Sequence, residues 1–391
     1  MITINDKRDC SGCTACYAIC GRHAIEMRED PLGFKYPVVD TEKCVECGLC
    51  DKVCAFNDIY STPDNLDRPI ALGGRHKDIE EVDKSRSGGI FAALSDAVLS
   101  EGGVIYGAGY DSSFRVIHKR ATDPSERDEL RGSKYVQSDI GNIFLQVESD
   151  IKANRKVLFS GTPCQTAGLS SFLRLRKVNC DRLLICDIVC HGVPSPYIWR
   201  DYLKYIQKKE RQKIIDVNFR DKLRFGWSAH KESFKLENKY ISTCTYTNAY
   251  FQHIMIRRSC EVCHYTNLRR TGDITLADFW GWEKSNPDMN KDDKGISLIL
   301  VNTNKGARHI EQIKNKILSF PVNIEQALQP NLQSPSSVHP GREQFEKDYE
   351  RFGFEKSMSR HALIGWKHDV VRIMDRIKRK VHNVARKFRK L

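Results

Sequence analysis

Long hydrophobic runs are missing from this sequence of 391 residues. Its apolar stretches are far shorter than the roughly 20 residues that a membrane-spanning helix needs. The apolar segment of a signal peptide does not follow Met1 either. We therefore expect a cytoplasmic protein, in whose reducing surroundings the 15 cysteines bind iron or remain free thiols.

The sequence also lacks the common nucleotide-binding motifs. It contains no G-x-G-x-x-G fingerprint and no Walker A loop, so NAD and ATP are not the first cofactors to expect. The net charge of +13 is uneven, because residues 372–391 carry nine Lys or Arg and one acid, Asp375, and so contribute +8 of it. The charge therefore gives no argument for nucleic-acid binding, and we expect no nucleic-acid partner.

What the sequence does contain is a cysteine pattern that occurs twice within the first 54 residues. The pattern C-x-x-C-x-x-C-x-x-x-C is formed by Cys10, Cys13, Cys16 and Cys20, and again by Cys44, Cys47, Cys50 and Cys54. Three thiolates on a tight loop can bind one [4Fe-4S] cubane, while the fourth starts a helix that carries it to the other cubane. We therefore expect two clusters with crossed ligand sets. Cys54 joins the first three cysteines of the first copy, and Cys20 joins the first three of the second.

The alternative interpretations of this repeat are a zinc module and a disulfide framework. Zinc sites rarely use two runs of four cysteines at this spacing, so we favour iron. The residue after the fourth cysteine, usually proline in bacterial-type ferredoxins, is Gly21 or Ala55 here, which leaves the ligands unchanged. The stretch resembles a two-cluster [4Fe-4S] ferredoxin domain and implies that electrons pass through the protein.

Beyond a polar stretch after Cys54, predicted strands and helices alternate. The expected strands are residues 69–75, 104–110, 156–161, 183–189, 213–219, 271–280 and 295–303, with a hairpin in 231–245. The expected helices are 90–101, 140–153, 165–175, 197–209 and 306–317. Interleaved strands and helices are typical of an α/β domain with a largely mixed sheet.

Three junctions between a predicted strand and a helix are rich in glycine or capped by proline. They are SRSGG (85–89), FSGTPCQ (159–165) and CHGVPSP (190–196). A helix N-terminus suits phosphate, and glycine lets the backbone approach a ligand closely. Each junction taken alone is equally compatible with an ordinary tight turn.

A second group of cysteines accompanies these junctions. Cys260 and Cys263 form a C-x-x-C pair, and Cys164 and Cys190 each follow a predicted strand, where ligands of α/β folds gather. Four thiolates from three loops could hold a third [4Fe-4S] cluster beside a bound cofactor. The alternative is that Cys164 and Cys190 are small buried residues.

Polar residues around the same loops fit a flavin, which needs cations or amides at its pyrophosphate. The candidate cofactor-binding residues are Arg86, Ser87, Gly88, Gly89, Ser133, Lys134, Gly161 and Thr162. His191 is the candidate catalytic residue, as a proton donor, although an inert loop histidine is an equal alternative.

Residues 69–303 resemble the coenzyme F420 hydrogenase/dehydrogenase beta-subunit family. The matching stretches are KSRSGGIFAAL, VIYGAGYD, LRGSKYVQSDIG, VLFSGTPCQTAGL, CHGVPSP, FRDKLRFGW and RRSCEVCHYTNLRRTGDITLADFWG. The resemblance implies FAD, one nearby [4Fe-4S] cluster, and electron transfer between that flavin and the ferredoxin clusters. Relatives act on the deazaflavin coenzyme F420, on glutamate-synthase or sulfite-reducing partners, or on a chlorophyll derivative, so the substrate stays open. Ala277 stands where the family commonly has glycine.

The expected architecture therefore combines α+β and α/β parts. A ferredoxin-like 2[4Fe-4S] module (1–60) and a linker (61–68) precede a mixed-sheet flavin-binding domain (69–330), and a C-terminal extension (331–391) ends in a helical tail. In that tail, hydrophobic residues such as Ile373, Ile377 and Val381 share one face of a helix and the cations cover the other. Such a helix lies on the inner face of an anionic membrane, or docks on the protein's own core with its basic face in solvent.

The expected function is that of an iron–sulfur flavoprotein oxidoreductase. It would pass electrons between FAD, with a small-molecule substrate such as coenzyme F420, and the clusters, and then to a redox partner protein or small electron carrier. The alternatives are an electron-transfer subunit that serves a separate catalytic partner, and a non-F420 reductase in the biosynthesis of bacterial surface polysaccharide.

Overall fold

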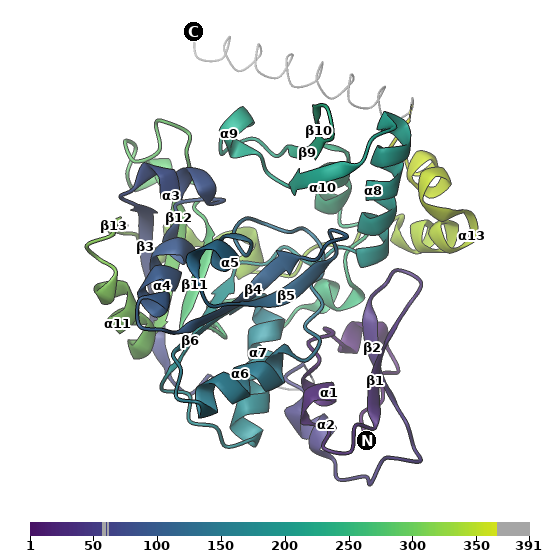
Figure 1. Cartoon of the computed structure of the whole chain (residues 1–391), viewed down its shortest axis with the longest axis horizontal. Helices are drawn as coiled ribbons and strands as arrows, with labels where there is room; N and C mark the ends of the chain where they lie inside the picture. Colours follow the sequence, from purple (N-terminus) through teal and green to yellow (C-terminus); the bar gives the residue numbers. More distant parts are fainter. Residues whose placement is uncertain (57–59, 61, 366–391) are drawn as a thin grey trace.

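A computed structural model describes residues 1–56, 60 and 62–365 of the chain. The basic amphipathic helix expected over residues 372–391 lies outside these residues. Within the described part of the chain, no helix combines the length and the apolar character required to cross a membrane. A large sheet occupies the centre of the molecule, with the N-terminal module against one side of it and a mainly helical layer near one end (Figure 1).

The central sheet has eight strands in the order β13-β3-β12-β11-β7-β6-β4-β5. The strands are β3 (Asn65–His76), β4 (Val104–Tyr110), β5 (Val116–Ala121), β6 (Val157–Gly161), β7 (Leu183–Ile188), β11 (Ile274–Asp278), β12 (Ser297–Thr303) and β13 (Ile317–Pro321). Strands β4, β6, β7 and β11 are parallel, and the remaining pairings are antiparallel. This arrangement confirms the predicted mixed sheet.

Alternate residues of the central strands bury opposite faces of the sheet, as the period of two requires. On one face, Leu158 and Leu184 pack with α4 (Ile90–Leu99), and α11 (Asn304–Gln312) joins the same cluster. On the other face, Phe159 and Ile185 pack with α6 (Ile143–Lys152) and α7 (Pro163–Leu175). Helices thus cover both faces, which leaves the carboxyl ends of the parallel strands free to form a site.

The N-terminal module contains two short helices and a hairpin. These are α1 (Ala15–Ile19), α2 (Leu49–Val53), β1 (Ile25–Glu29) and β2 (Lys35–Val39). Helices α1 and α2 contact each other and α7, so the module sits directly on the sheet domain. The prediction that each fourth cysteine starts a helix is wrong, because Cys20 and Cys54 end α1 and α2. The left-handed residues Thr14 (φ 66°) and Gly48 (φ 69°) start these helices earlier than expected.

A third body, besides the central sheet domain and the N-terminal module, packs around aromatic side chains, among them Trp199, Tyr202 and Tyr246. It contains α8 (Pro196–Glu210), β8 (Ile214–Asn218), β9 (Glu232–Leu236), β10 (Tyr240–Thr243), α10 (Thr245–Phe251) and α13 (Arg342–Arg360). The smaller helices are α3 (Ile79–Lys84), α5 (Pro124–Asp128), α9 (Lys222–Phe225) and α12 (Ile324–Ala327). The hairpin β9–β10 turns beside Asn238, as expected.

Several elements differ from their sequence-based predictions. Strand β3 begins at Asn65, inside the polar stretch expected as a linker, and strands β1, β2, β5 and β13 were not predicted. The helix expected over 306–317 ends at Gln312, and Ile317 starts β13 instead. Strands β5 and β13 lie at the sheet edges, where pairing with one neighbour rather than a strong sequence pattern defines them.

Candidate functional site

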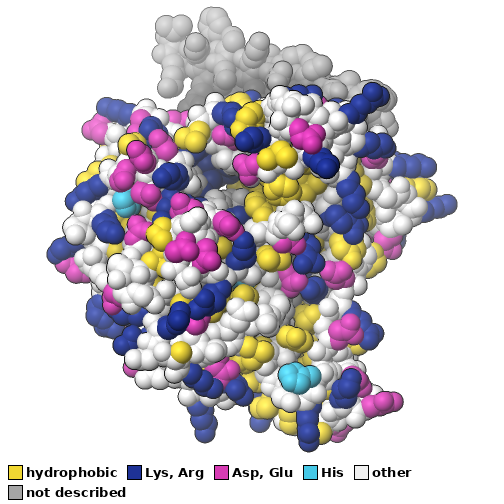
Figure 2. Space-filling model, in the orientation of Figure 1, with side chains coloured by type: hydrophobic (Ala, Val, Ile, Leu, Met, Phe, Trp, Pro, Cys, Tyr) yellow, Lys and Arg dark blue, Asp and Glu magenta, His cyan; other side chains and the backbone are white. Residues whose placement is uncertain are grey.

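A cleft with a cavity volume of about 330 Å³ lies at the carboxyl ends of the central strands. Gly161 at the end of β6, Cys190 after β7 and Asp278 at the end of β11 all line it. This is the edge at which open α/β sheets bind their ligands. Figure 2 shows a hollow on one face of the molecule with hydrophobic side chains beside it, on a surface where acidic and basic groups are intermingled.

Most of the candidate cofactor-binding residues line this cleft. They are Arg86, Ser87, Gly89, Ser133, Lys134, Gly161 and Thr162. Gly88 does not line it but packs behind the loop, where a Cβ atom would lie 2.3 Å from the carbonyl oxygen of Gly74. The backbone nitrogen of Gly88 donates to Ser297 Oγ at 3.0 Å. Gly88 therefore lets the loop lie close to the sheet and contributes no ligand-facing surface.

Lys222 holds this loop in place from the third body. Its Nζ donates to the carbonyl oxygens of Ser87 (3.1 Å), Lys294 (2.7 Å) and Val82. Ser87 Oγ in turn donates to the carbonyl of Ile296 at 2.6 Å. The loop is therefore fixed before any ligand enters, which lowers the entropic cost of binding one.

Lys134 lies on the β4–β5 side of the cleft. Its Nζ donates to the carbonyl oxygens of Glu129 (2.9 Å) and Arg131 (2.6 Å). Burial lowers the pKa of Lys134 to about 7. An anion bound beside it would favour the ammonium form and raise that pKa again, so Lys134 is suited to contact a phosphate.

The N-terminus of α7 faces the cleft next to Lys134. Thr162 and Gln165 form a capping box, in which the Thr162 backbone nitrogen donates to Gln165 Oε1 at 3.0 Å. Thr162 Oγ1 also lies 3.2 Å from Cys164 Sγ. The loop that begins α7 at the cleft thus also positions a cysteine.

His191 lines the cleft directly after Cys190. Its backbone oxygen accepts a hydrogen bond from Ser336 Oγ at 2.9 Å. Burial lowers the pKa of His191, although the nearby carboxylate of Asp278 acts in the opposite direction. A neutral imidazole at neutral pH follows.

The structure brings Cys164, Cys190, Cys260 and Cys263 together from three loops. Burial raises the pKa of the Cys190 thiol well above its usual range, and the neighbouring thiols of the other three cysteines raise it further. Cys190 also lines the cleft. Four thiols therefore gather at the inner end of the candidate cofactor site.

Cysteines of the first expected ferredoxin ligand set also lie near one another, with Cys54 among them. Burial raises the pKa of Cys16, and the thiols of Cys13, Cys10 and Cys54 raise it further. Burial also raises the pKa of Cys13 to about 11, with smaller contributions from Cys10 and from Cys164. Cys13 and Cys164 thus bring the first ferredoxin set next to the set at the cleft.

The second ferredoxin set lies nearer the surface. Backbone nitrogens donate to two of its sulfurs, from Ile2 to Cys50 Sγ at 3.2 Å and from Ala24 to Cys20 Sγ at 3.3 Å. Cys47 is exposed. Amide–sulfur hydrogen bonds of this kind stabilise the reduced state of an iron–sulfur cluster.

Among the described residues, no three His, Cys, Asp or Glu side chains converge on a point suited to a single metal ion. The ligands of a cubane need not converge on one point, because its four thiolates bind four separate iron atoms. The clustered thiols match that donor chemistry. Since bound iron needs thiolates, cluster binding would replace the protons that burial keeps on these sulfurs.

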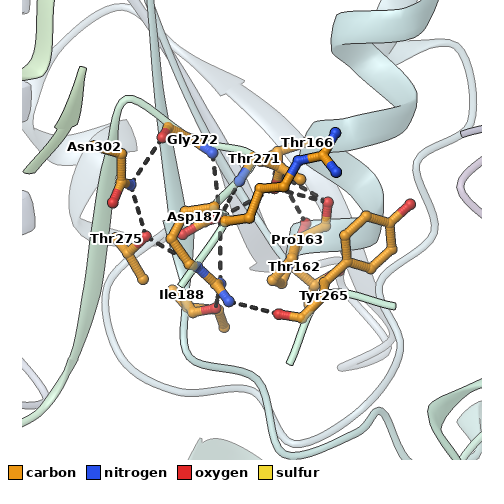
Figure 3. Close-up of polar contacts among 12 residues, drawn as sticks. Thr162, Pro163, Thr166, Asp187, Ile188, Tyr265, Thr271, Gly272, Thr275 and Asn302 are labelled. Carbon is orange, nitrogen blue, oxygen red and sulfur yellow. Dashed lines mark hydrogen bonds and ion pairs between the residues drawn. The ribbon is translucent and has the colours of Figure 1, made fainter. Parts of the chain in front are cut away.

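A buried ion pair connects the three loops that carry Cys164, Cys190 and Cys263 (Figure 3). Asp187 and Arg270 are almost fully buried, and Arg270 Nη2 lies 3.3 Å from Asp187 Oδ2. Arg270 also donates to the carbonyl oxygens of Tyr265 (2.6 Å) and Ile188 (3.0 Å). Thr271 Oγ1, which donates to Asp187 Oδ2, lies within hydrogen-bond distance of the Pro163 carbonyl as well. The network therefore fixes the relative positions of the loops.

Several residues at the site were not predicted. Arg220, His230 and Trp280 line the cleft, while Arg257 and Tyr265 contact the cysteine loops. Arg220 lies within FRDKLRFGW, and Arg257 lies three residues before Cys260. These positions were visible in the motifs, but a basic residue in a motif does not show whether its side chain is buried.

Two parts of the chain match families of known proteins. Residues 154–321 match the family described as the C terminus of the coenzyme F420 hydrogenase/dehydrogenase beta subunit, and residues 9–57 match the 4Fe-4S dicluster domain. Among solved structures, a chain of the F420-reducing [NiFe] hydrogenase complex from Methanosarcina barkeri is 17% identical. The similarity covers 76% of this chain and 93% of that one, with a TM-score of 0.46. No curated protein matches the chain. The chain is thus similar to the coenzyme F420 hydrogenase/dehydrogenase beta subunit over residues 154–321, and it carries a 4Fe-4S dicluster domain at its N-terminus.

Proposed function

We propose that this protein is an iron–sulfur flavoprotein oxidoreductase with FAD in the cleft and three [4Fe-4S] clusters. One observation carries the proposal: Cys190 lines the cleft and groups with Cys164, Cys260 and Cys263, and Cys164 adjoins Cys13 of the ferredoxin module. The thiols therefore form a continuous path from the cleft to the ferredoxin sites.

The residues on the β6–β4–β5 side of the cleft suit the pyrophosphate of FAD. Lys134 supplies a cation, and Gly161 and Thr162 place the N-terminus of α7, the positive end of its dipole, at the cleft. Gly107 and Ala108 of β4 line the same side without large side chains, which leaves room for a flat ring system. FAD in this position would convert electron pairs into the single electrons that cubanes carry.

The roles of the cysteines follow from their grouping. The set at the cleft would hold the cluster nearest the flavin, the set of Cys10, Cys13, Cys16 and Cys54 the middle cluster, and the set of Cys20, Cys44, Cys47 and Cys50 the outermost one. Because Cys47 is exposed, the outermost set is accessible to a redox partner protein or a small electron carrier. His191 would hold a proton beside the substrate in this scheme.

The substrate proposed first is coenzyme F420, whose name the matched family bears. The same name describes a beta subunit, which favours a second candidate function, that of an electron-transfer subunit bound to a catalytic partner. The two functions differ in whether the isolated chain oxidises or reduces a small molecule.

The test uses the full chain purified without oxygen. We expect bound FAD in the purified protein and bleaching of the cluster absorbance when reduced coenzyme F420 is added. A chain that contains FAD but is bleached only by a protein electron donor would be the subunit of the second candidate function. Purified protein without any flavin, even after incubation with FAD, would rule out the flavoenzyme proposal.

A further inference from the structure

Two buried arginines share one carboxylate on the side of the cleft opposite Lys134. The side chains of Arg86 and Arg220 are 10% and 4% exposed, and both pair with Asp278 Oδ2. Arg86 lies in the loop between α3 and α4, which packs on β3 and β12 through Gly88, while Arg220 follows β8 and Asp278 ends β11. In the strand order, β3 and β11 lie on the other side of β7 from β6, β4 and β5. The arginine pair is therefore separate from Lys134 and the α7 N-terminus, which suit the flavin pyrophosphate.

The hydrogen-bonding capacity of these two guanidinium groups is only partly used. Both donate to the carbonyl oxygen of Trp227, from Arg86 Nη2 at 2.7 Å and Arg220 Nη2 at 3.0 Å. Arg86 Nε, Arg86 Nη1 and Arg220 Nε are buried without any partner. A buried donor without an acceptor destabilises the protein, so these nitrogens indicate a place for a bound acceptor.

The charges around the pair are also unbalanced. Arg86 and Arg220 carry two positive charges against the single negative charge of Asp278. Asp293 also acts on the Arg86 charge, but its carboxylate accepts hydrogen bonds from the backbone nitrogen and the hydroxyl of Ser228 instead. Lys222 is a further buried cation near Arg86, and burial lowers the pKa of His230 to about 4. Among the described residues, Asp278 is the only carboxylate within ion-pair distance of either arginine, so a bound anion would compensate the remaining positive charge.

An aromatic wall borders the same place. Trp280 stacks on Trp227 with ring centroids 4.4 Å apart, and His230 stacks on Trp280 at 5.7 Å. The Arg220 guanidinium lies 5.5 Å from the Trp280 ring. A ligand whose oxyanion meets the arginines therefore has a flat apolar surface beside it.

We propose that Arg86 and Arg220 bind the oxyanion of the substrate, a small molecule with a carboxylate or phosphate attached to a planar group that packs beside Trp280. The inference rests on the proposed function, since it names the substrate class of the same cleft. It assigns the Arg86 side chain to the substrate and leaves the flavin pyrophosphate to Lys134 and the α7 N-terminus. A guanidinium pair is suited to this task because its planar N–H groups match an oxyanion.

The test measures the binding of benzoate, a planar carboxylate, to the flavin-loaded protein, by the flavin difference spectrum and by tryptophan fluorescence. We expect benzoate to bind and uncharged benzyl alcohol not to bind. Arg86→Gln and Arg220→Gln should each weaken the binding of benzoate about tenfold or more, because each variant loses hydrogen bonds to a charged group. Arg75→Gln, which removes a mostly buried arginine paired with Asp292 outside the cleft, should leave the affinity unchanged.

Competition distinguishes the two sources of the oxyanion. Displacement of benzoate by inorganic phosphate assigns the site to phosphorylated substrates, and displacement by acetate assigns it to carboxylic acids.

An unaltered affinity for benzoate in both arginine variants would overturn the inference. Loss of FAD from both variants would also overturn it, because it would assign the arginines to the flavin. If the glutamine variants do not fold, Arg220→Lys tests the inference instead. We expect this variant to bind benzoate more weakly, and a wild-type affinity for benzoate would contradict the inference. The protein could also take up no FAD and still bind benzoate, as seen by tryptophan fluorescence. That result would refute the proposed flavin cofactor and support the anion site.

A different observation concerns Arg257, which is fully buried between two of the cysteine sets. Its Nε donates to the Cys10 carbonyl at 2.8 Å, and its Nη2 lies 3.6 Å from Cys10 Sγ. Cys164 and Cys260 also lie near its guanidinium group. Among the described residues, no carboxylate lies within ion-pair distance of Arg257. Its other acceptors are neutral, namely Gln137 Oε1 at 3.0 Å and the Lys35 carbonyl at 2.9 Å.

A buried cation that faces sulfur instead of a carboxylate requires a negative charge at the sulfur. We infer that Arg257 compensates the charge of the cluster held by Cys10 and raises its reduction potential. A positive charge stabilises the reduced, more negative state of a cluster, so its removal shifts the potential in the negative direction. Arg257 is a positioning and tuning residue in this scheme, since it contacts a ligand and not the substrate.

The test is a reduction potential, measured by EPR during a redox titration of the full anaerobic protein. We expect Arg257→Gln to make the potential of one cluster more negative with the iron content retained, and Arg257→Lys to remain closer to the wild type. Arg258→Gln is the matched control, because the adjacent Arg258 pairs with Glu346.

A second variant keeps the inference testable if Arg257→Gln does not fold. Gln137→Glu places a carboxylate against Arg257 Nη1 and should neutralise its charge with the guanidinium in place. It should also make the potential more negative. Wild-type potentials in the folded variants, with full iron content, would overturn the inference.

Discussion

The double variant Cys260→Ser, Cys263→Ser is expected to lose about four iron atoms per chain, from about twelve to about eight. The physical reason is the grouping of these two thiols with Cys190 and Cys164, since a cubane deprived of two of its four thiolates does not persist. The two ferredoxin sets share no cysteine with this group, so their iron should remain. The measurement is iron and acid-labile sulfide per chain in protein purified without oxygen.

Cys180→Ser provides the matched control. Cys180 is half-buried, donates to the backbone oxygen of Val178 and belongs to none of the three cysteine sets. Its replacement should leave the iron content unchanged. An iron content of about twelve in the double variant would show that Cys260 and Cys263 bind no cluster.

The second large effect is expected on stability. Asp187→Ala removes the only carboxylate within ion-pair distance of Arg270 among the described residues and leaves a guanidinium buried without charge compensation. Breaking a buried pair in this way costs about 3–5 kcal/mol. Thr271 Oγ1 and the backbone nitrogens of Thr271 and Gly272 lose their shared acceptor as well. The free energy of unfolding should fall accordingly in a denaturant titration.

Two variants separate this effect from a general loss of charge. Asp181→Asn, at an exposed turn, should change the stability by less than about 0.5 kcal/mol. The double variant Asp187→Leu, Arg270→Met replaces the pair by apolar groups and should be more stable than Asp187→Ala, because no lone charge remains buried. A stability of Asp187→Ala within about 0.5 kcal/mol of the wild type would mean that the pair does not fix the loops.

The cysteine sites illustrate how much of the site the sequence determines. The spacing of Cys10, Cys13 and Cys16 predicts a shared site because neighbours along a tight loop cannot lie far apart. Cys164 and Cys190 were identified by their places after predicted strands, since parallel strands end at one edge of a sheet. The association of all four cleft cysteines depends on the β6–β7–β11 order, which local patterns only suggest.

The arginines show where sequence reasoning stops. Arg86, Arg220 and Arg257 look like ordinary solvated cations in the sequence, and each is buried by residues far away along the chain. Arg220 meets Asp278 and Arg257 meets Cys10 only through tertiary packing. Edge strands β5 and β13 were missed for a related reason, because a partner strand rather than their own pattern stabilises them.

In the proposed function, electrons move between the cleft and the ferredoxin module through the cluster of Cys164, Cys190, Cys260 and Cys263. Photoreduction of the flavin in anaerobic protein, followed by the bleaching of the cluster absorbance over time, tests this claim most directly. We expect bleaching to follow flavin reduction in the wild type and to become much slower in the Cys260→Ser, Cys263→Ser variant, which keeps its FAD and its ferredoxin iron. Equal transfer rates in the two proteins would contradict it.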